Sequence, residues 1–206
     1  MGCSEEKIMA NLGVRLDGKH ALIIGARSGI GLAVSEAYIE YGAEVPIVAI
    51  DDTIHEAAHK LKETFGSSVK ALQCDVFDHE ALRTAMAEIV RIDVLVCDAG
   101  LERLTPVTRQ NPDVEENFHK IFDVNLFGAL YAAHEALSKI PDGGRIIYTA
   151  SKHGFWVMMR SFSQDLGSRR ITVNSICLGR VNIEFSNRSV REIATDTGRG
   201  IQEVGN

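Results

Sequence analysis

The chain alternates short apolar runs with longer amphipathic runs, and this alternation limits the folds that it can adopt. Parallel strands need helical crossovers and are buried on both faces, so they appear as nearly continuous apolar runs. The pattern therefore predicts a doubly wound parallel sheet with helices on both faces, in one domain spanning residues 1–206. The strand-like runs are 20–26, 43–50, 69–76, 92–100, 145–148 and 171–179, and the helical runs are 29–42, 54–66, 78–90, 114–140 and 153–167.

Composition excludes several classes of function. Hydrophobic residues make up 45% and charged residues 24%, as in ordinary globular proteins, and no apolar run reaches the ~18 residues of a membrane span. The net charge is −6 without a clustered basic face, which argues against nucleic acid as a partner. His55 and His59 are four residues apart but lack a third ligand, so we expect no metal site. The four scattered cysteines favour free thiols and a cytoplasmic location.

A glycine-rich turn, GARSGIG, follows the first strand-like run and opens the first helical run. Gly25, Gly29 and Gly31 let the backbone turn sharply and leave room for a pyrophosphate at the positive end of the helix dipole. In the first βα unit of such a sheet this turn predicts dinucleotide binding. One face of the helix is expected to carry its apolar residues, Ile30, Val34, Ala37 and Tyr41.

The choice between NAD and NADP depends on the end of the second strand-like run. An acidic residue there would hold the ribose hydroxyls; the expected position is Ala49, and Asp51 and Asp52 follow it closely. Arg27 in the glycine-rich turn would instead pair with a 2′-phosphate. Two carboxylates would oppose a phosphate dianion, so the sequence favours NAD over NADP.

The chain resembles the short-chain dehydrogenase/reductase family from about residue 16 to 195. This resemblance implies a three-layer Rossmann fold with strand order 3-2-1-4-5-6. It rests on motifs that occur in the family's order: GARSGIG (25–31), CDV (74–76), CDAG (97–100), VNLFG (124–128), YTASK (148–152) and ITVNSICLG (171–179).

The resemblance also implies the site residues. Tyr148 would be the acid/base, with Lys152 lowering its pKa and holding the nicotinamide ribose. Asn125 would complete a proton relay. Ser151 is the second-choice candidate for the side chain that donates a hydrogen bond to the substrate carbonyl. The implied cofactor-binding residues are Gly25, Arg27, Ser28, Gly29, Ile30, Gly31, Asp75, Val76, Ala99, Gly100 and Lys152.

The segment RIIYTASKHG allows two readings that exclude each other. If RIIYTAS is the fifth strand, Ser151 takes the place of the family's serine and no tyrosine is left. If YTASKHG opens a helix, Tyr148 and Lys152 lie one helical turn apart and the serine is missing. We favour the helix reading, because Lys152 leads directly into the helical run that follows.

Relative to the family, the chain has apparent deletions between the fifth strand and the Tyr-x-x-x-Lys helix and at the C-terminus. We expect an NAD(P)-dependent oxidoreductase that interconverts a secondary alcohol and a ketone, and that forms a homo-oligomer, either a dimer or a tetramer. The alternative is a relative that binds a nucleotide or a partner without catalysis. The substrate and the direction of the reaction stay open.

Overall fold

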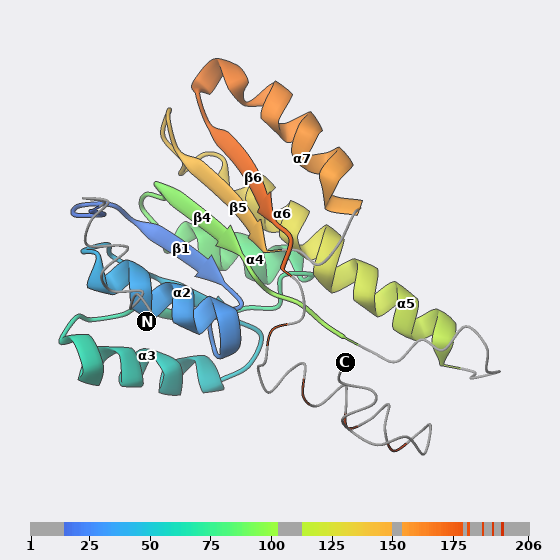
Figure 1. Cartoon of the computed structure of the whole chain (residues 1–206), viewed down its shortest axis with the longest axis horizontal. Coiled ribbons are helices and arrows are strands. Elements are labelled where there is room, and N and C mark those ends of the chain that lie inside the picture. Colours follow the sequence, from blue (N-terminus) through green and yellow to red (C-terminus); the bar gives the residue numbers. More distant parts are fainter. Residues whose placement is uncertain are drawn as a thin grey trace, which may run out of the picture.

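The computed structural model describes residues 15–102, 113–149 and 154–178, together with Val181, Asn187, Arg191 and Thr195; the side chains of residues 154–158 lie outside this description. A six-stranded parallel sheet of order β3-β2-β1-β4-β5-β6 forms its centre (Figure 1). The predicted three-layer Rossmann fold and its strand order are therefore confirmed. The strands are β1 (Ala21–Ile24), β2 (Ile47–Ala49), β3 (Ala71–Gln73), β4 (Val94–Cys97), β5 (Arg145–Thr149) and β6 (Thr172–Ile176).

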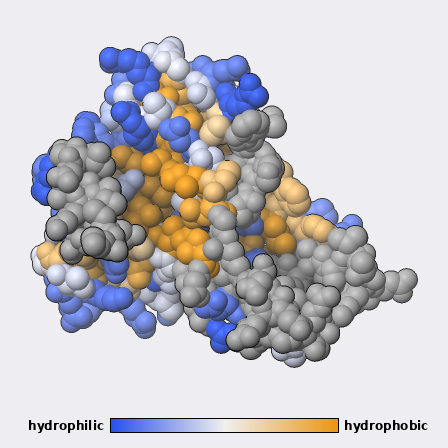
Figure 2. All heavy atoms as spheres, in the orientation of Figure 1, coloured by the Kyte–Doolittle hydropathy of each residue, from blue (hydrophilic) through white to orange (hydrophobic). Residues whose placement is uncertain are grey.

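The helices cover both faces of the sheet. One core cluster packs α2 and α3 on one face, and a second packs α4 and α6 on the other. Figure 2 shows apolar side chains gathered in the middle of the viewed face, with hydrophilic ones around them. The helices are α2 (Gly29–Glu40), α3 (Thr53–Phe65), α4 (His79–Ala87), α5 (Val114–Phe122), the π-helix η1 (Asp123–Gly128), α6 (Ala129–Ala136), α7 (Gly154–Asp165) and the 3₁₀-helix η2 (Gly167–Arg169).

The central strands are apolar throughout because both of their faces are covered. All four residues of β1 and all four of β4 are buried. Side chains alternate between the two clusters, so Ile23 packs with α2 and α3 while Leu22 and Ile24 pack with α4 and α6. This explains why both strands appear in the sequence as uninterrupted apolar runs.

Helix ends follow their local chemistry. The Asp78 side chain caps α4 by accepting hydrogen bonds of 3.0 Å from the backbone N–H groups of Glu80 and Ala81. Gly66 ends α3 in the left-handed conformation, with φ of 70°. The expected helix over 114–140 is divided, because the π-helix η1 separates α5 from α6.

The expected apolar face of α2 is only partly buried. The fully buried residues are Gly31, Ser35 and Ile39, while Val34 of the expected face packs partly buried against the same cluster. A Cβ on Gly31 would lie 2.5 Å from the carbonyl oxygen of Gly25, so the first turn of α2 has no room for a larger residue against β1. Small residues therefore mark the inner face of this helix.

Candidate active site

The glycine-rich turn lies against the end of β4. Gly25 has a φ of +93°, and a Cβ added to it would lie 2.4 Å from the backbone nitrogen of Ala99. Its N–H donates a 2.8 Å hydrogen bond to the carbonyl of Val48, which fixes the turn against the end of β2. Glycine is thus needed at this position both for its conformation and for the close approach of two backbones.

The first turn of α2 offers a place for an anion. Ser28 is the N-cap residue in an extended conformation, and its side chain makes no capping hydrogen bond. The first N–H groups of α2 therefore have no side-chain cap, and they lie at the positive end of the helix dipole. Gly29 follows with φ of +62°. These features fit a dinucleotide pyrophosphate at this turn.

Arg27 of the glycine-rich turn and Asp51, after β2, form an ion pair. The guanidinium of Arg27 lies 3.5 Å from Oδ2 of Asp51, and both side chains are more than a third exposed. Asp51 also accepts hydrogen bonds from the hydroxyl and the backbone N–H of Thr53. The bond from the Thr53 hydroxyl, together with the nearby Arg27 charge, lowers the pKa of Asp51. The two groups predicted to favour opposite cofactors are therefore paired with each other.

Asp75 and Val76 shape the turn after β3. The Asp75 carboxylate accepts a 2.9 Å hydrogen bond from the backbone N–H of Phe77, and the Val76 side chain is buried. A Cβ on Gly128, in η1, would lie only 2.5 Å from a methyl group of Val76. Gly128 is a residue that sequence reasoning missed, although a glycine inside a helical run is an unusual feature in itself.

Asn125 holds the turn after β4. It is buried in η1, where its side-chain amide donates a 2.7 Å hydrogen bond to the carbonyl of Leu101 and accepts one from the Leu101 N–H. A Cβ on Gly100 would lie 3.4 Å from the same side-chain oxygen. The Asn125 side chain is thus engaged with the backbone beside Ala99 and Gly100. A π-turn inside a helix often marks a functional site.

Tyr148 is not at the start of a helix, so the reading that we favoured is wrong. It lies in β5, where it is paired with Cys97 of β4, and its side chain is 1% exposed within the cluster that packs α4 and α6. Burial raises the pKa of its phenol above the ordinary value, whereas an acid/base at neutral pH needs a lowered one. In β5, Ile146 and Tyr148 alternate with Arg145 and Ile147, as a strand requires.

The helix that follows, α7, begins only at Gly154. A strand residue and Lys152 cannot share one helical turn, so the expected arrangement of Tyr148 and Lys152 is also wrong. Lys152 and Ser151 themselves lie outside the described residues, in the connection 150–153. The strand reading places Ser151 two residues after the last residue of β5.

Thr149 and Asp98 form a contact that the sequence did not predict. The Thr149 hydroxyl at the end of β5 donates a hydrogen bond to the Asp98 carboxylate, directly after β4. Asp98 continues the β1–β4 pairing through a 2.8 Å hydrogen bond from its N–H to the carbonyl of Ile24. The ends of three strands are therefore tied together beside the glycine-rich turn.

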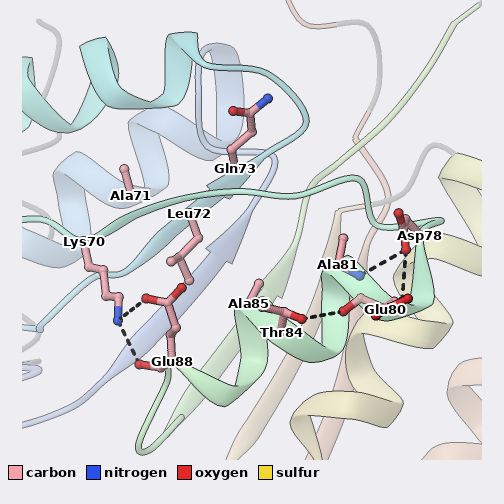
Figure 3. A pocket seen from close by; sticks show the side chains of 10 residues that line it. All are labelled: Lys70, Ala71, Leu72, Gln73, Asp78, Glu80, Ala81, Thr84, Ala85 and Glu88. Atoms are coloured by element: carbon pink, nitrogen blue, oxygen red, sulfur yellow. Dashed lines mark hydrogen bonds and ion pairs between the residues drawn. The ribbon is translucent and has the colours of Figure 1, made fainter.

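A surface groove lies elsewhere on the molecule. It has a volume of about 480 Å³ between β3 and α4, and an ion pair of 2.9 Å between Lys70 and Glu88 crosses one end (Figure 3). All ten residues that line it come from the segment 70–88, so it is separate from the site described above. Among the described residues, no cluster of three potential ligands could hold a metal ion, and no helix is long and apolar enough to cross a membrane.

Comparisons with known proteins agree with this geometry. The model of the family described as "Enoyl-(Acyl carrier protein) reductase" matches residues 25–197. Versicolorin reductase 1 of Aspergillus parasiticus is 34% identical over 195 residues, which cover 83% of this chain and 72% of the relative.

Two solved structures are similar over most of the chain. L-sorbose reductase from Gluconobacter frateurii, complexed with NADPH and L-sorbose, has a TM-score of 0.77 and 25% identity, and the match covers 92% of this chain and 80% of that one. A short-chain dehydrogenase from Burkholderia cenocepacia in complex with NADP has a TM-score of 0.74 and 25% identity, covering 86% and 84%. These complexes do not support the preference for NAD that we drew from Asp51 and Asp52. From the matched family, the relative and the shared fold, we conclude that the chain belongs to the short-chain dehydrogenase/reductase family of NAD(P)-dependent oxidoreductases.

Proposed function

We propose that this protein binds NADP(H) and transfers a hydride between it and a secondary alcohol or ketone. The proposal rests on a phosphate cradle that has two parts. One is the turn with Gly25 and Gly31, where an added Cβ would overlap neighbouring atoms, and the other is the N-terminus of α2, which has no side-chain cap. When bound, the dinucleotide supplies the hydride donor or acceptor. Gly25 lets the turn pack against Ala99, Gly31 lets the first turn of α2 pack against Gly25, and Asn125 holds the neighbouring turn.

The preference for NADP rests on Arg27. A 2′-phosphate carries more charge than the Asp51 carboxylate and binds a guanidinium with better geometry, so it would take Arg27 from Asp51. The hydrogen bonds from Thr53 would still hold Asp51 in place. The NADP and NADPH complexes of the two similar structures support the same choice.

Two matched variants test the cofactor choice. Arg27→Ala should weaken NADPH binding about 10-fold or more and NADH binding little, because only NADPH has a charged group for Arg27. Asp51→Asn should strengthen NADPH binding, because it removes both the competing partner and a repulsive charge. Fluorescence titration of each variant with both cofactors gives the affinities. Equal losses for NADH and NADPH in Arg27→Ala would contradict the assignment.

For the chemical step, we propose that Ser151 polarises the substrate carbonyl and that Lys152 holds the nicotinamide ribose. Both follow the last residue of β5 within three positions of the sequence, and β5 ends at the sheet edge where ligands of doubly wound folds bind. Tyr148 has no part in this proposal, because its side chain lies within the core. The ketone class is supported by the similarity to a sorbose reductase.

The burial of Tyr148 favours a second candidate, a family member that binds the dinucleotide without turnover. A panel of ketones with NADPH, tested on the wild type, Ser151→Ala and Tyr148→Phe, separates the two. The first proposal expects turnover that Ser151→Ala loses and Tyr148→Phe keeps. NADPH binding without turnover in the wild type would favour the second candidate. Loss of turnover in a folded Tyr148→Phe variant would contradict the proposal that Tyr148 is a core residue without a catalytic role.

We also propose that the protein is a homo-oligomer and works in the cytoplasm. No residue of α5 is buried, and its side chains Phe118 and Phe122 are 40% and 52% exposed, which favours contact with a second copy. Light scattering should give at least a dimer, and Phe118→Ser with Phe122→Ser should shift it toward monomer. The described thiols Cys74, Cys97 and Cys177 are free, in keeping with a reducing compartment.

A further inference from the structure

Asp98 directly follows β4, at the point of the sheet edge where the strand order reverses between β1 and β4. Its Oδ1 accepts the hydrogen bond from the Thr149 hydroxyl at the end of β5. Its Oδ2 lies 3.0 Å from the position that a Cβ on Gly31 would take, in the first turn of α2. The carboxylate is therefore held between the end of β5 and the glycine-rich turn, at the edge where a dinucleotide would bind.

The position of Asp98 relates it to one end of the cofactor. In a sheet of this order, each half of the sheet holds one mononucleotide, and the dinucleotide crosses the reversal point. Arg27 and Asp51 lie at the adenosine half, formed by β1, β2 and β3. Asp98 directly follows β4 and Thr149 ends β5, so both belong to the other half, which in such a sheet would receive the nicotinamide.

We propose that Asp98 discriminates between the oxidation states of the dinucleotide and favours the oxidised form. This inference rests on the proposed function. The nicotinamide ring carries a positive charge when oxidised and none when reduced, while the phosphates carry the same charge in both forms. A carboxylate near the ring attracts only the oxidised form, and its repulsion of the phosphates cancels in the ratio of the two affinities.

The consequence is a bias in the direction of the reaction. In alcohol oxidation, a hydride leaves the alcohol carbon for C4 of the nicotinamide, the hydroxyl proton is released, and a ketone and the reduced dinucleotide form. Tighter binding of the oxidised form raises the share of bound cofactor that can accept a hydride. Asp98 thus acts as a specificity-determining residue for the cofactor's redox state, not for the substrate.

The test compares dissociation constants for NADP⁺ and NADPH on the wild type, Asp98→Asn and Asp51→Asn. Asp98→Asn keeps the size of the side chain and an oxygen that can accept from Thr149. It should lower the ratio Kd(NADPH)/Kd(NADP⁺) by about 3- to 10-fold, as for one unit charge acting across a partly solvated cleft. Asp51→Asn is the matched control: it removes a carboxylate at the adenosine half and should change both constants by the same factor.

The outcomes separate this inference from the proposed function. If Asp98→Asn changes both constants equally, or changes only the thermal stability, Asp98 is a structural support and the inference is overturned. If the wild type binds neither form, the proposed function fails as well. If Asp98→Asn does not fold, the same titrations can be made on the wild type with added salt. The ratio Kd(NADPH)/Kd(NADP⁺) must then fall as salt screens the Asp98 charge, and a constant ratio overturns the inference.

Discussion

Replacing Gly25 with alanine tests whether the glycine-rich turn must lie against the end of β4. The substitution forces a φ of +93° on a residue with a Cβ, and that Cβ lies 2.4 Å from the nitrogen of Ala99. The obstructing atoms belong to the backbone, so no side-chain rotation relieves the overlap. The strain of the left-handed region costs roughly 1–2 kcal/mol, and the overlap adds about 1–3 kcal/mol.

Gly66→Ala provides the matched control. Gly66 has a similar left-handed conformation, with φ of +70°, but nothing lies within 4 Å of its added Cβ. It should lose only the strain of roughly 1–2 kcal/mol. Gly25→Ala should therefore be less stable than Gly66→Ala by about 1–3 kcal/mol, and each kcal/mol lowers the Tm by about 2–4 °C in a chain of this size.

Urea unfolding gives the free energies of both variants, and fluorescence titration with NADPH gives their affinities. Gly25→Ala should also lose cofactor affinity, because relief of the overlap moves the turn away from Ala99, whereas Gly66→Ala should bind as the wild type does. Equal destabilisation in the two variants would show that only conformation, and not the approach of two backbones, requires glycine at residue 25.

Two further predictions concern the supports of the site, and a third concerns the ion pair of Arg91 and Asp93 before β4. Asn125→Ala should lower stability by about 2–4 kcal/mol and weaken NADPH binding, because the partly buried backbone groups of Leu101 lose both partners; unchanged urea unfolding and titration would contradict this. Gly128→Ala should destabilise by about 1–3 kcal/mol, and adding Val76→Ala should recover part of that loss, because it removes the methyl group that the new Cβ overlaps. Additive losses in this double-mutant cycle would show that the two residues do not touch. The hydrogen bonds from Arg91 lower the pKa of Asp93 to about 2, against the burial that opposes them. The ionised Asp93 therefore contributes roughly 2 kcal/mol above pH ~4 that is lost as the pH falls toward 2, and unfolding of Asp93→Asn measured against pH should lack this step.

The fold was predictable because its strands are buried on both faces. Such strands cannot alternate polar with apolar residues, so β1 and β4 remain visible as apolar runs in the sequence. The glycine-rich turn was also predictable. Backbone atoms approach Gly25 and Gly31 too closely for a side chain, and the glycines that this requires are visible in the sequence as a motif. The inner face of α2 was not predictable from the sequence. Periodicity favours large apolar residues on that face, but the first turn of the helix lies too close to β1 for them.

The error at Tyr148 has a specific cause. The spacing to Lys152 fits one helical turn, and we gave the direct continuation of Lys152 into the helical run 153–167 more weight than the alternation within RIIYT. The contact between Asp98 and Thr149 could not be predicted from the sequence for a different reason. It depends on the register between β4 and β5, in which Cys97 lies opposite Tyr148, and no local pattern encodes that register.

Cofactor binding and catalysis depend on different parts of this molecule, and that separation decides how its function should be tested. The phosphate cradle needs only the end of β1, the first turn of α2 and the turn after β4, which Asn125 holds. The catalytic groups that we propose, Ser151 and Lys152, lie in the sequence connection between β5 and α7. Because the cradle is complete without that connection, a loss of turnover would say nothing about the cradle. Affinity for the dinucleotide must therefore be measured independently of turnover.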